Sequence, residues 1–189
     1  MTYELLPNGA FARDMAATYH YPFDPCLARA LVDLFSGQSV VDFGAGPGKY
    51  VRAMIDAGID AAGVDAVPEI ETLTQGLVTE YDLANIRGQL PCPAPDWALC
   101  LEVLEHIPAH LLSVALENLH RHNRRGIVLS WAIPGQGGDG HVSEQHNAFA
   151  IEWFTGLGYR HDQITQAHLR MAVSDLWWFA NSLMVFRRK

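Results

Sequence analysis

The stretch VVDFGAGPGKY, residues 40–50, decides the fold. Two valines lead into Asp42 and then into three glycines, Gly44, Gly46 and Gly48. Apolar residues followed by closely spaced glycines are typical of a buried strand, a tight turn and the start of a helix. Because such loops usually hold phosphate groups, the carboxylate of Asp42 at the mouth of this one needs an explanation.

Strands and helices alternate on both sides of this stretch. We expect helices over residues 25–36, 49–58, 108–126 and 147–157, and strands over residues 39–43, 59–65, 77–83, 95–103, 126–133 and 181–188. This alternation predicts an α/β fold with a doubly wound, mostly parallel sheet. Ligands bind such sheets beyond the carboxyl ends of the strands, so the residues that follow each strand are the candidates for a site.

The composition indicates one folded domain over residues 1–189, because 49% of the residues are hydrophobic and only 18% are charged. The net charge of −8, with no long basic run, argues against a surface that tracks duplex nucleic acid. Three widely spaced cysteines argue against a disulfide framework, and no stretch resembles a signal peptide or a membrane span. We therefore expect a cytoplasmic protein, monomeric or homodimeric, without a membrane partner.

The loop fails both phosphate-binding motifs. A P-loop requires a glycine where Phe43 stands and a serine or threonine where Tyr50 stands, and a dinucleotide fingerprint requires its third glycine where Lys49 stands. Asp42 would repel a pyrophosphate, whereas it would attract a cationic ligand. A cationic ligand with an adenosine half fits this loop, and S-adenosylmethionine is such a ligand.

Two further acids follow the next strands and support the adenosine half. Asp65 ends the second expected strand, where a carboxylate can accept hydrogen bonds from both ribose hydroxyls. Asp82 ends the third expected strand and could accept from the adenine amino group.

The stretches VVDFGAGPGKY, GVDAVPEI, YDLA and WALCLEVLEHIP resemble successive motifs of the class I S-adenosylmethionine-dependent methyltransferases, over roughly residues 25–133. The resemblance implies a small single-domain enzyme with a Rossmann-like, seven-stranded sheet and an antiparallel C-terminal strand. S-adenosylmethionine is the implied cofactor. The implied cofactor-binding residues are Asp42, Gly44, Gly46, Gly48, Asp65, Val67, Asp82, Leu83, Leu101 and Glu102.

The resemblance also implies a role for each of these residues. The three glycines would pass the methionine moiety, and Asp42 would orient its amino group. Asp65 would hold the ribose, while Val67, Asp82 and Leu83 would surround the adenine. Leu101 and Glu102 would lie against the methionine end.

The chain leaves no room for a separate acceptor domain. We therefore expect residues 1–24, which include an aromatic run at Tyr19 and Tyr21, to form a lid or to contact the acceptor. The tryptophans Trp131, Trp177 and Trp178 could line an acceptor cleft, but we expect them to pack in the core. His141 follows a glycine-rich loop after the fifth expected strand, and we regard it as the candidate general base.

A metal site is a competing interpretation. Glu102, Glu105 and His106 are spaced i, i+3, i+4, and His141 or His146 could complete a ligand set. This pattern resembles the divalent-metal site of small-RNA 3′-terminal 2′-O-methyltransferases. The stretch EVLEH also occurs in ubiquinone-pathway O-methyltransferases, where it need not imply a metal, so we expect none here.

The sequence therefore predicts methyl transfer from S-adenosylmethionine, by direct displacement, to a hydroxyl of a small or sugar-like acceptor. Three alternatives stay open: an N-methyltransferase, a metal-dependent O-methyltransferase acting on a sugar or an RNA terminus, and a non-catalytic subunit that binds the cofactor.

Overall fold

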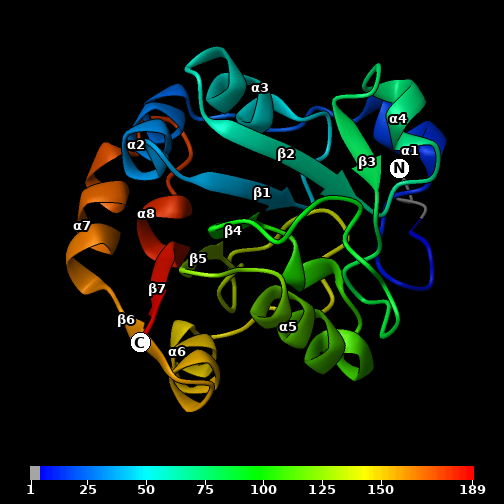
Figure 1. The fold of residues 1–189 in the computed structure, drawn as a ribbon. Coiled ribbons are helices and arrows are strands. Elements are labelled where there is room, and N and C mark those ends of the chain that lie inside the picture. The colour runs from blue at the N-terminus through cyan, green and yellow to red at the C-terminus, as the bar shows by residue number, and fades with distance from the viewer. Residues whose placement is uncertain (1–4) are drawn as a thin grey trace.

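A seven-stranded sheet with the strand order β3-β2-β1-β4-β5-β7-β6 runs through the molecule (Figure 1). The computed structural model describes residues 5–189. Strands β1 to β5 pair in parallel, whereas β7 is antiparallel to both β5 and β6. The expected doubly wound sheet with an antiparallel C-terminal strand is confirmed. The strands are β1 Ser39–Phe43, β2 Asp60–Asp65, β3 Val78–Glu80, β4 Trp97–Leu101, β5 Gly126–Ser130, β6 Tyr159–His161 and β7 Met184–Arg188.

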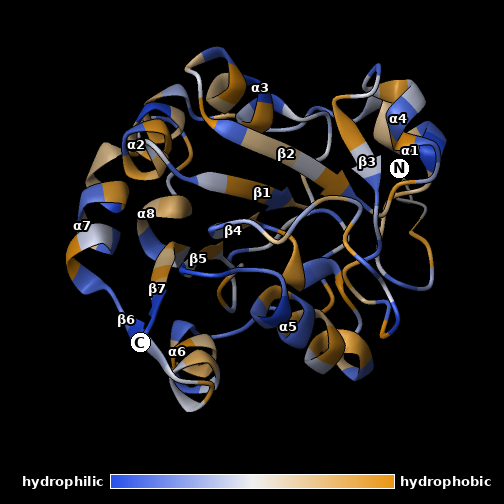
Figure 2. Ribbon diagram, viewed as in Figure 1, coloured by the Kyte–Doolittle hydropathy of each residue, from blue (hydrophilic) through white to orange (hydrophobic). Residues whose placement is uncertain are grey.

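Helices cover both faces of the sheet (Figure 1). One face packs against α2 Pro25–Phe35, α3 Lys49–Asp56 and α7 Gln163–Ala172, and the other packs against α5 Leu112–Arg121 and α6 Asn147–Gly156. Figure 2 shows hydrophobic residues along the central strands and polar residues on the outer sides of the helices. The short helices are α1 Arg13–Thr18, α4 Ile70–Leu73, α8 Phe179–Ser182 and two 3-10 turns, η1 Leu104–His106 and η2 Ala109–Leu111.

Helix α2 shows how the sequence determines where a helix begins and which side of it faces the sheet. Asp24 caps α2 by accepting hydrogen bonds from the backbone N–H groups of Cys26 and Leu27, at 3.1 and 2.9 Å. Pro25 occupies the first helical position, where no N–H donor is needed. Four helical positions then face the sheet and are buried: Leu27, Ala28, Leu31 and Phe35.

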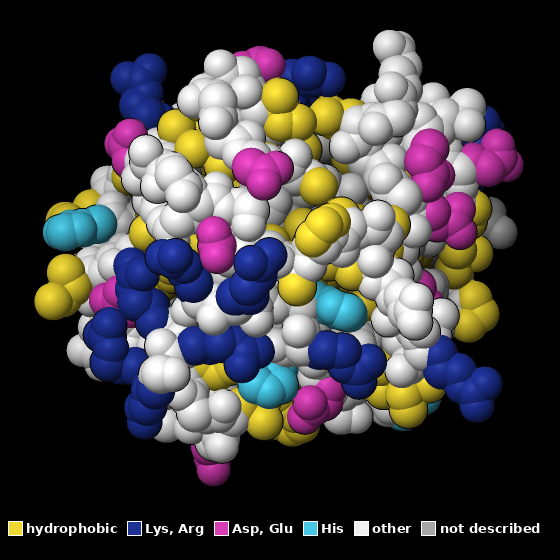
Figure 3. Space-filling view, viewed as in Figure 1, with side chains coloured by type: hydrophobic (Ala, Val, Ile, Leu, Met, Phe, Trp, Pro, Cys, Tyr) yellow, Lys and Arg dark blue, Asp and Glu magenta, His cyan; other side chains and the backbone are white. Residues whose placement is uncertain are grey.

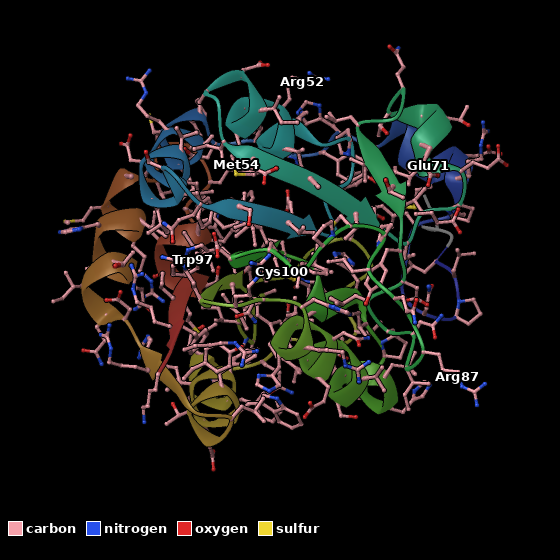
Figure 4. The ribbon with its side chains drawn as sticks, in the orientation of Figure 1. Arg52, Met54, Glu71, Arg87, Trp97 and Cys100 are labelled. Atoms are coloured by element: carbon pink, nitrogen blue, oxygen red, sulfur yellow. The ribbon has the colours of Figure 1, made fainter. Side chains whose placement is uncertain are left out.

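The side chains of α3 divide in the same way. In Figure 4, Met54 points from α3 toward the sheet, while Arg52 of the same helix lies on its outer side. Trp97 and Cys100, on β4, lie in the interior of the molecule and are fully buried. The strand that carries them therefore has the sheet's central, two-sided environment, which explains its almost continuous apolar sequence.

Several boundaries differ from the sequence-based expectation. The helix expected over residues 108–126 begins as the 3-10 turn η2 and ends at Arg121, and the third strand is confined to Val78–Glu80. β6 and α7 were not expected. β6 has only three residues, and α7 buries only Leu169 while Ile164 and Met171 are exposed, so neither element carries a clear apolar period.

None of the helices formed by residues 5–189 is long and apolar enough to cross a membrane.

Candidate functional site

The glycine loop after β1 folds back over β2. Gly44, Gly46 and Gly48 all adopt the left-handed region, with φ of 75°, 52° and 74°, which explains why glycine is needed at each position. A Cβ atom on Gly44 would lie 2.3 Å from a methyl group of Val103, and one on Gly48 would lie 2.7 Å from a methyl group of Leu77. The loop is therefore a tightly packed turn with its backbone close to neighbouring side chains.

A cavity of about 560 Å³ opens at the carboxyl ends of the central strands. Asp42, Gly44, Leu101 and Glu102 line one side of it, at the ends of β1 and β4. The opposite walls come from three segments far apart in the sequence: the aromatic run before α2, the glycine-rich loop after β5, and the residues before α8. From these three segments come Tyr19, Tyr21, Pro22, Gln136, Gly137, Gly138, Asp139, His141, Trp177 and Trp178. The rest of the lining comes from other parts of the chain: Phe11, Ala45, Pro47, Lys49, Tyr50, His106 and Phe179.

A second cavity of about 100 Å³ lies beside the first and shares Gly44 and Glu102 with it. The other residues expected at the adenosine half line this smaller cavity: Asp65, Val67, Asp82 and Leu83. The structure thus brings together eight of the ten expected cofactor-binding residues. Gly46 and Gly48 line neither cavity, because Gly46 lies under the Tyr21 ring and Gly48 packs against Leu77.

Asp42 is buried, with 3% of its surface exposed, and lines the large cavity. Burial raises the pKa of Asp42 well above its usual value, and the nearby charge of Asp65 raises it further. A cationic group in the cavity would oppose both effects by stabilising the ionised carboxylate. Asp42 therefore fits the ammonium and sulfonium charges of S-adenosylmethionine better than it fits a phosphate.

Asp65 connects the glycine loop to the smaller cavity. Its carboxylate accepts hydrogen bonds from the backbone N–H groups of Gly46 and Val67, at 2.7 and 3.0 Å. Burial raises the pKa of Asp65, although these hydrogen bonds act in the opposite direction. Asp82 is held in a similar way, since one oxygen accepts from the N–H of Ala84 at 2.8 Å. Both acids are therefore oriented by the backbone around them.

Glu102 is the first residue after β4 and adopts a left-handed conformation with φ of 54°, which is uncommon for a residue with a side chain. Its carboxylate accepts hydrogen bonds from Gln136 Nε2 at 2.5 Å and Ser182 Oγ at 3.3 Å. Burial raises the pKa of Glu102, while the hydroxyl of Ser130 and the other two donors lower it. Glu102 thus joins β4, the glycine-rich loop and α8 at the floor of both cavities.

His141 lines the large cavity, and 12% of its side chain is exposed. The loop that carries it is fixed, because the backbone N–H groups of Val142 and Ser143 donate to the carbonyl oxygen of Glu105 at 2.8 and 2.9 Å. A Cβ atom on Gly138 would lie 2.3 Å from Nε2 of His141. The glycine at position 138 therefore makes room for the imidazole.

The groups considered for a metal do not all come together. Glu105, His106 and His141 offer ligand atoms within 4.8 Å of one another, whereas Glu102 is bonded elsewhere and His146 is not part of the group. Both carboxyl oxygens of Glu105 are buried without a hydrogen-bond partner. Burial raises the pKa of Glu105 well above its usual value, and the nearby Glu102 raises it further. This direction disfavours the deprotonated carboxylate that a metal needs, and the expectation of no metal stays a prediction.

The aromatic segment before α2 lies against the site. Tyr21 packs on Gly46 and lines both cavities, and its backbone oxygen accepts a hydrogen bond of 2.7 Å from Lys49 Nζ. Residues 5–24 of the expected lid are therefore close to the candidate site, while residues 1–4 lie outside the described part of the chain.

The expectation of core packing is wrong for Trp177, whereas Trp178 packs against the core and also lines the large cavity. Trp131 is buried in the core as expected, and its Nε1 donates to the carbonyl oxygen of Ser143 at 2.7 Å. Trp177 is 57% exposed, and both it and Trp178 line the large cavity. They do so because the segment between α7 and α8 is drawn to Asp24, which accepts hydrogen bonds from the N–H groups just before them.

Sequence reasoning missed several wall residues, among them Tyr50, Gln136 and Phe179. Gln136 stands inside the glycine-rich loop that was already regarded as unusual, so its position could have identified it. Tyr50 and Phe179 lie in helices and carry no comparable pattern.

Comparison with protein families gives one match. The family described as "Methyltransferase domain" matches residues 13–164, which is most of the chain. Among curated proteins, no sequence matches this one significantly.

Solved structures with the same fold belong to proteins of very different activities. Magnesium protoporphyrin IX methyltransferase from Synechocystis PCC 6803, with bound S-adenosylmethionine, is 18% identical at a TM-score of 0.64, covering 94% of this chain and 90% of that one. The sugar N-methyltransferase KedS8 from Streptoalloteichus is 14% identical at 0.66, covering 91% and 96%. The [4+2]-cyclase SpnF is 18% identical at 0.54, covering 85% and 80%. At these identities the likeness establishes the fold alone.

Proposed function

This chain belongs to the methyltransferase domain family, and from that premise we propose that it transfers a methyl group from S-adenosylmethionine to a hydroxyl of a small or sugar-like acceptor. The observation that carries the proposal is the position of His141. It lines the same cavity as Asp42 and Glu102, the two acids assigned to the methionine end of the cofactor.

The two adjoining cavities suit the two halves of the cofactor. Asp65, Val67, Asp82 and Leu83 would hold the adenosine half in the smaller cavity. In the larger cavity, Asp42 supplies a buried carboxyl group for the positively charged methionine half. When bound there, S-adenosylmethionine supplies a methyl group that is already activated by its positively charged sulfur.

The rest of the large cavity is left for the acceptor. Aromatic rings from Tyr19, Tyr50 and Trp178 offer flat apolar surfaces, while Gln136 and Asp139 offer hydrogen-bonding groups. A wall of aromatic faces with a few polar groups suits a small ring that carries hydroxyls. This combination supports a small-molecule acceptor.

Transfer to a hydroxyl requires that the acceptor lose a proton. In the proposed step the acceptor O–H bond breaks and its proton passes to His141. S-adenosylmethionine held beside His141 would supply the methyl group to the acceptor oxygen, and its carbon–sulfur bond would break with the electron pair left on sulfur. The chain's main contribution is to align the acceptor oxygen with the methyl group.

An N-methyltransferase is the second candidate, because Glu102 and Asp139 line the cavity and could attract an amine. The sugar N-methyltransferase KedS8 has the same fold. An amine acceptor needs no strong base, so the two candidates differ in how much they depend on His141. A metal-dependent O-methyltransferase and a non-catalytic cofactor-binding subunit are the remaining alternatives.

The test begins with calorimetry, in which we expect the purified chain to bind S-adenosylmethionine and S-adenosylhomocysteine. A panel of hydroxyl and amine acceptors is then screened for release of S-adenosylhomocysteine. Binding without turnover on any acceptor, in a chain that stimulates the activity of a partner subunit, would favour the non-catalytic alternative. Turnover on amines alone would favour the N-methyltransferase.

With an acceptor found, we expect His141→Ala to keep cofactor affinity and to lose about 10²–10⁴-fold in single-turnover rate, the usual contribution of a general base. The matched control is His168→Ala, because His168 is exposed on α7. A rate within about threefold of the parent, in a variant that melts normally, would overturn the assignment of His141 as the base.

A further inference from the structure

Glu144 holds both the glycine-rich loop and the candidate base. Its carboxylate accepts hydrogen bonds from the backbone N–H groups of Gly135 and Gly137, both at 2.9 Å. The oxygen that receives Gly137 also lies 3.4 Å from Nδ1 of His141. One side chain thus contacts both ends of the loop segment that forms a wall of the large cavity.

The carboxylate of Glu144 is ionised near neutral pH. The N–H of Gly135 lowers the pKa of Glu144, and Gly137 and His141 lower it further. A carboxylate only accepts hydrogen bonds, so the nitrogen that faces it carries the proton. This arrangement places the proton of a neutral His141 on Nδ1 and leaves Nε2 with a free electron pair.

The other groups around His141 do not compete for this role. Glu105 Oε1 lies 3.9 Å from Nε2, beyond hydrogen-bond distance, and burial raises the pKa of Glu105. The His106 ring lies edge-on to His141, with the ring centroids 5.1 Å apart. Burial, together with His141, lowers the pKa of His106 to about 4, so this ring is uncharged near neutral pH.

We propose that Glu144 is the positioning residue of the reaction: it fixes the loop and holds His141 in the tautomer whose Nε2 can take the acceptor proton. Glu144 acts through His141 and does not touch the acceptor. The catalytic part of this inference rests on the proposed function, whereas the tautomer is a property of the chain itself. A carboxylate that orients an imidazole in this way is a recurring means of supporting a general base.

The tautomer can be measured without any acceptor. In the protein labelled with ¹⁵N at histidine, the ring nitrogen shifts and their couplings to the ring protons distinguish Nδ1–H from Nε2–H. The His141→Ala variant identifies the signals of His141. We expect the Nδ1–H form in the parent protein, and finding the Nε2–H form would overturn the proposal even if methyl transfer is confirmed.

The second test is a double-mutant cycle on single-turnover rate. Glu144→Gln is expected to lower the rate at least about tenfold with cofactor affinity unchanged, in line with the usual effect of removing an orienting carboxylate. In the His141→Ala background the same substitution should change the rate less than about twofold, since the group it orients is gone. Equal rate losses in both backgrounds would overturn the proposal and assign Glu144 a purely structural role.

Glu152→Gln is the matched control, because Glu152 is exposed on α6 and carries the same charge. If Glu144→Gln weakens the loop as a whole, the amide signals of Gly135 and Gly137 will shift together with those of the cavity wall. The tautomer of the unaltered protein still decides the proposal in that case. A failure of methyl transfer with every acceptor, together with an Nδ1–H His141, would contradict the proposed function and leave the placement of Glu144 intact.

Discussion

Asp65 has two tasks at the end of β2, because it faces the smaller cavity and also accepts hydrogen bonds from Gly46 and Val67. We expect Asp65→Ala to weaken binding of S-adenosylmethionine and S-adenosylhomocysteine by about 1.5–3 kcal/mol, the cost of losing a charge-assisted contact. Calorimetry measures the change. The control is Asp60→Ala, at the exposed start of the same strand.

Unchanged affinity in a folded Asp65→Ala protein would remove this residue from the ribose site. If NADH instead bound as strongly as S-adenosylmethionine, the proposed function would be wrong and the fold assignment would stand.

Gly138 leaves space for the imidazole of His141 because it has no side chain. Because a Cβ atom there would lie 2.3 Å from Nε2 of His141, Gly138→Ala must displace the imidazole or the loop. A displacement of about 1 Å near the reacting groups can cost about 10²-fold in rate, and we expect a loss of that order. Single-turnover kinetics measures it, with Gly156→Ala as control, since a Cβ atom on Gly156 meets no atom within 4 Å. Parent-like rates in Gly138→Ala would show that the position of His141 is not critical.

Removal of metal ions tests the group formed by Glu105, His106 and His141. We expect activity to survive dialysis against EDTA, because burial raises the pKa of Glu105 and so disfavours the deprotonated form that a metal ligand needs. Activity assays before and after dialysis, with Mg²⁺, Mn²⁺ or Zn²⁺ added back, measure the effect. A loss that one of these ions restores would assign these residues to a metal site.

At the scale of elements, Asp24 joins the start of α2 to the segment before α8. Burial alone would raise the pKa of Asp24, but hydrogen bonds from the backbone N–H groups of Leu27, Asp175 and Ser174 lower it to about 2. An unfolded aspartate has a pKa of about 3.9. The ionised carboxylate therefore stabilises the folded state above about pH 4, and this stabilisation is lost as the pH falls toward 2.

We expect Asp24→Ala to lower the free energy of unfolding at pH 7 by at least about 2 kcal/mol, since it removes a helix cap and leaves buried N–H groups without partners. Denaturant unfolding at pH 7 and pH 3 measures the difference. Asp33→Ala, on the exposed side of the same helix, is the control. If the parent and Asp24→Ala lost equal stability between pH 7 and pH 3, the assigned role of Asp24 would be wrong.

The sequence predicts best those elements whose residues determine their own conformation. The unit from β1 to β2 was recognised because glycines, an apolar run and an acid follow one another within a few residues. β6 and α7 were missed because β6 is short and α7 exposes Ile164 and Met171, so both depend on packing against the rest of the sheet.

The site divides in the same way. The place of acids such as Asp42 and Asp65 in the site could be predicted, because each stands at the end of an expected strand. The position of Trp177 could not, because it depends on hydrogen bonds between Asp24 and a segment about 150 residues away.

At the scale of the whole molecule, many of the basic side chains lie away from the cavity, where some of them pair with Asp96 and Asp162. Figure 3 shows lysine and arginine side chains gathered over the region of β6 and β7. Arg187 pairs with Gly126 at the start of β5, whereas Asp42 and Glu102 lie where the parallel strands end. Asp42 and Glu102 line the cavity together with Lys49, and a positively charged ligand there would be attracted by the two acids.

The sheet also depends on β7, which lies between β5 and β6. We expect a chain that ends after Leu183 not to fold, because Met184, Val185 and Phe186 are fully buried. Three such side chains are worth about 1.5–3 kcal/mol each, which together approaches the usual stability of a domain, about 5–15 kcal/mol. Circular dichroism melting measures the effect, with a chain that ends after Arg188 as control. Cooperative melting of the shorter chain would contradict this expectation.

The place of β7 also determines when folding can finish. Strand β7 begins at Met184, 54 residues after β5 ends at Ser130, and protein synthesis adds about 5–20 residues per second, so about 3–11 seconds separate the appearance of β5 from that of β7. During this time β5 has a free edge, which can pair with another chain. Chains made side by side on one messenger RNA can therefore aggregate with one another until β7 has emerged from the ribosome and paired with β5.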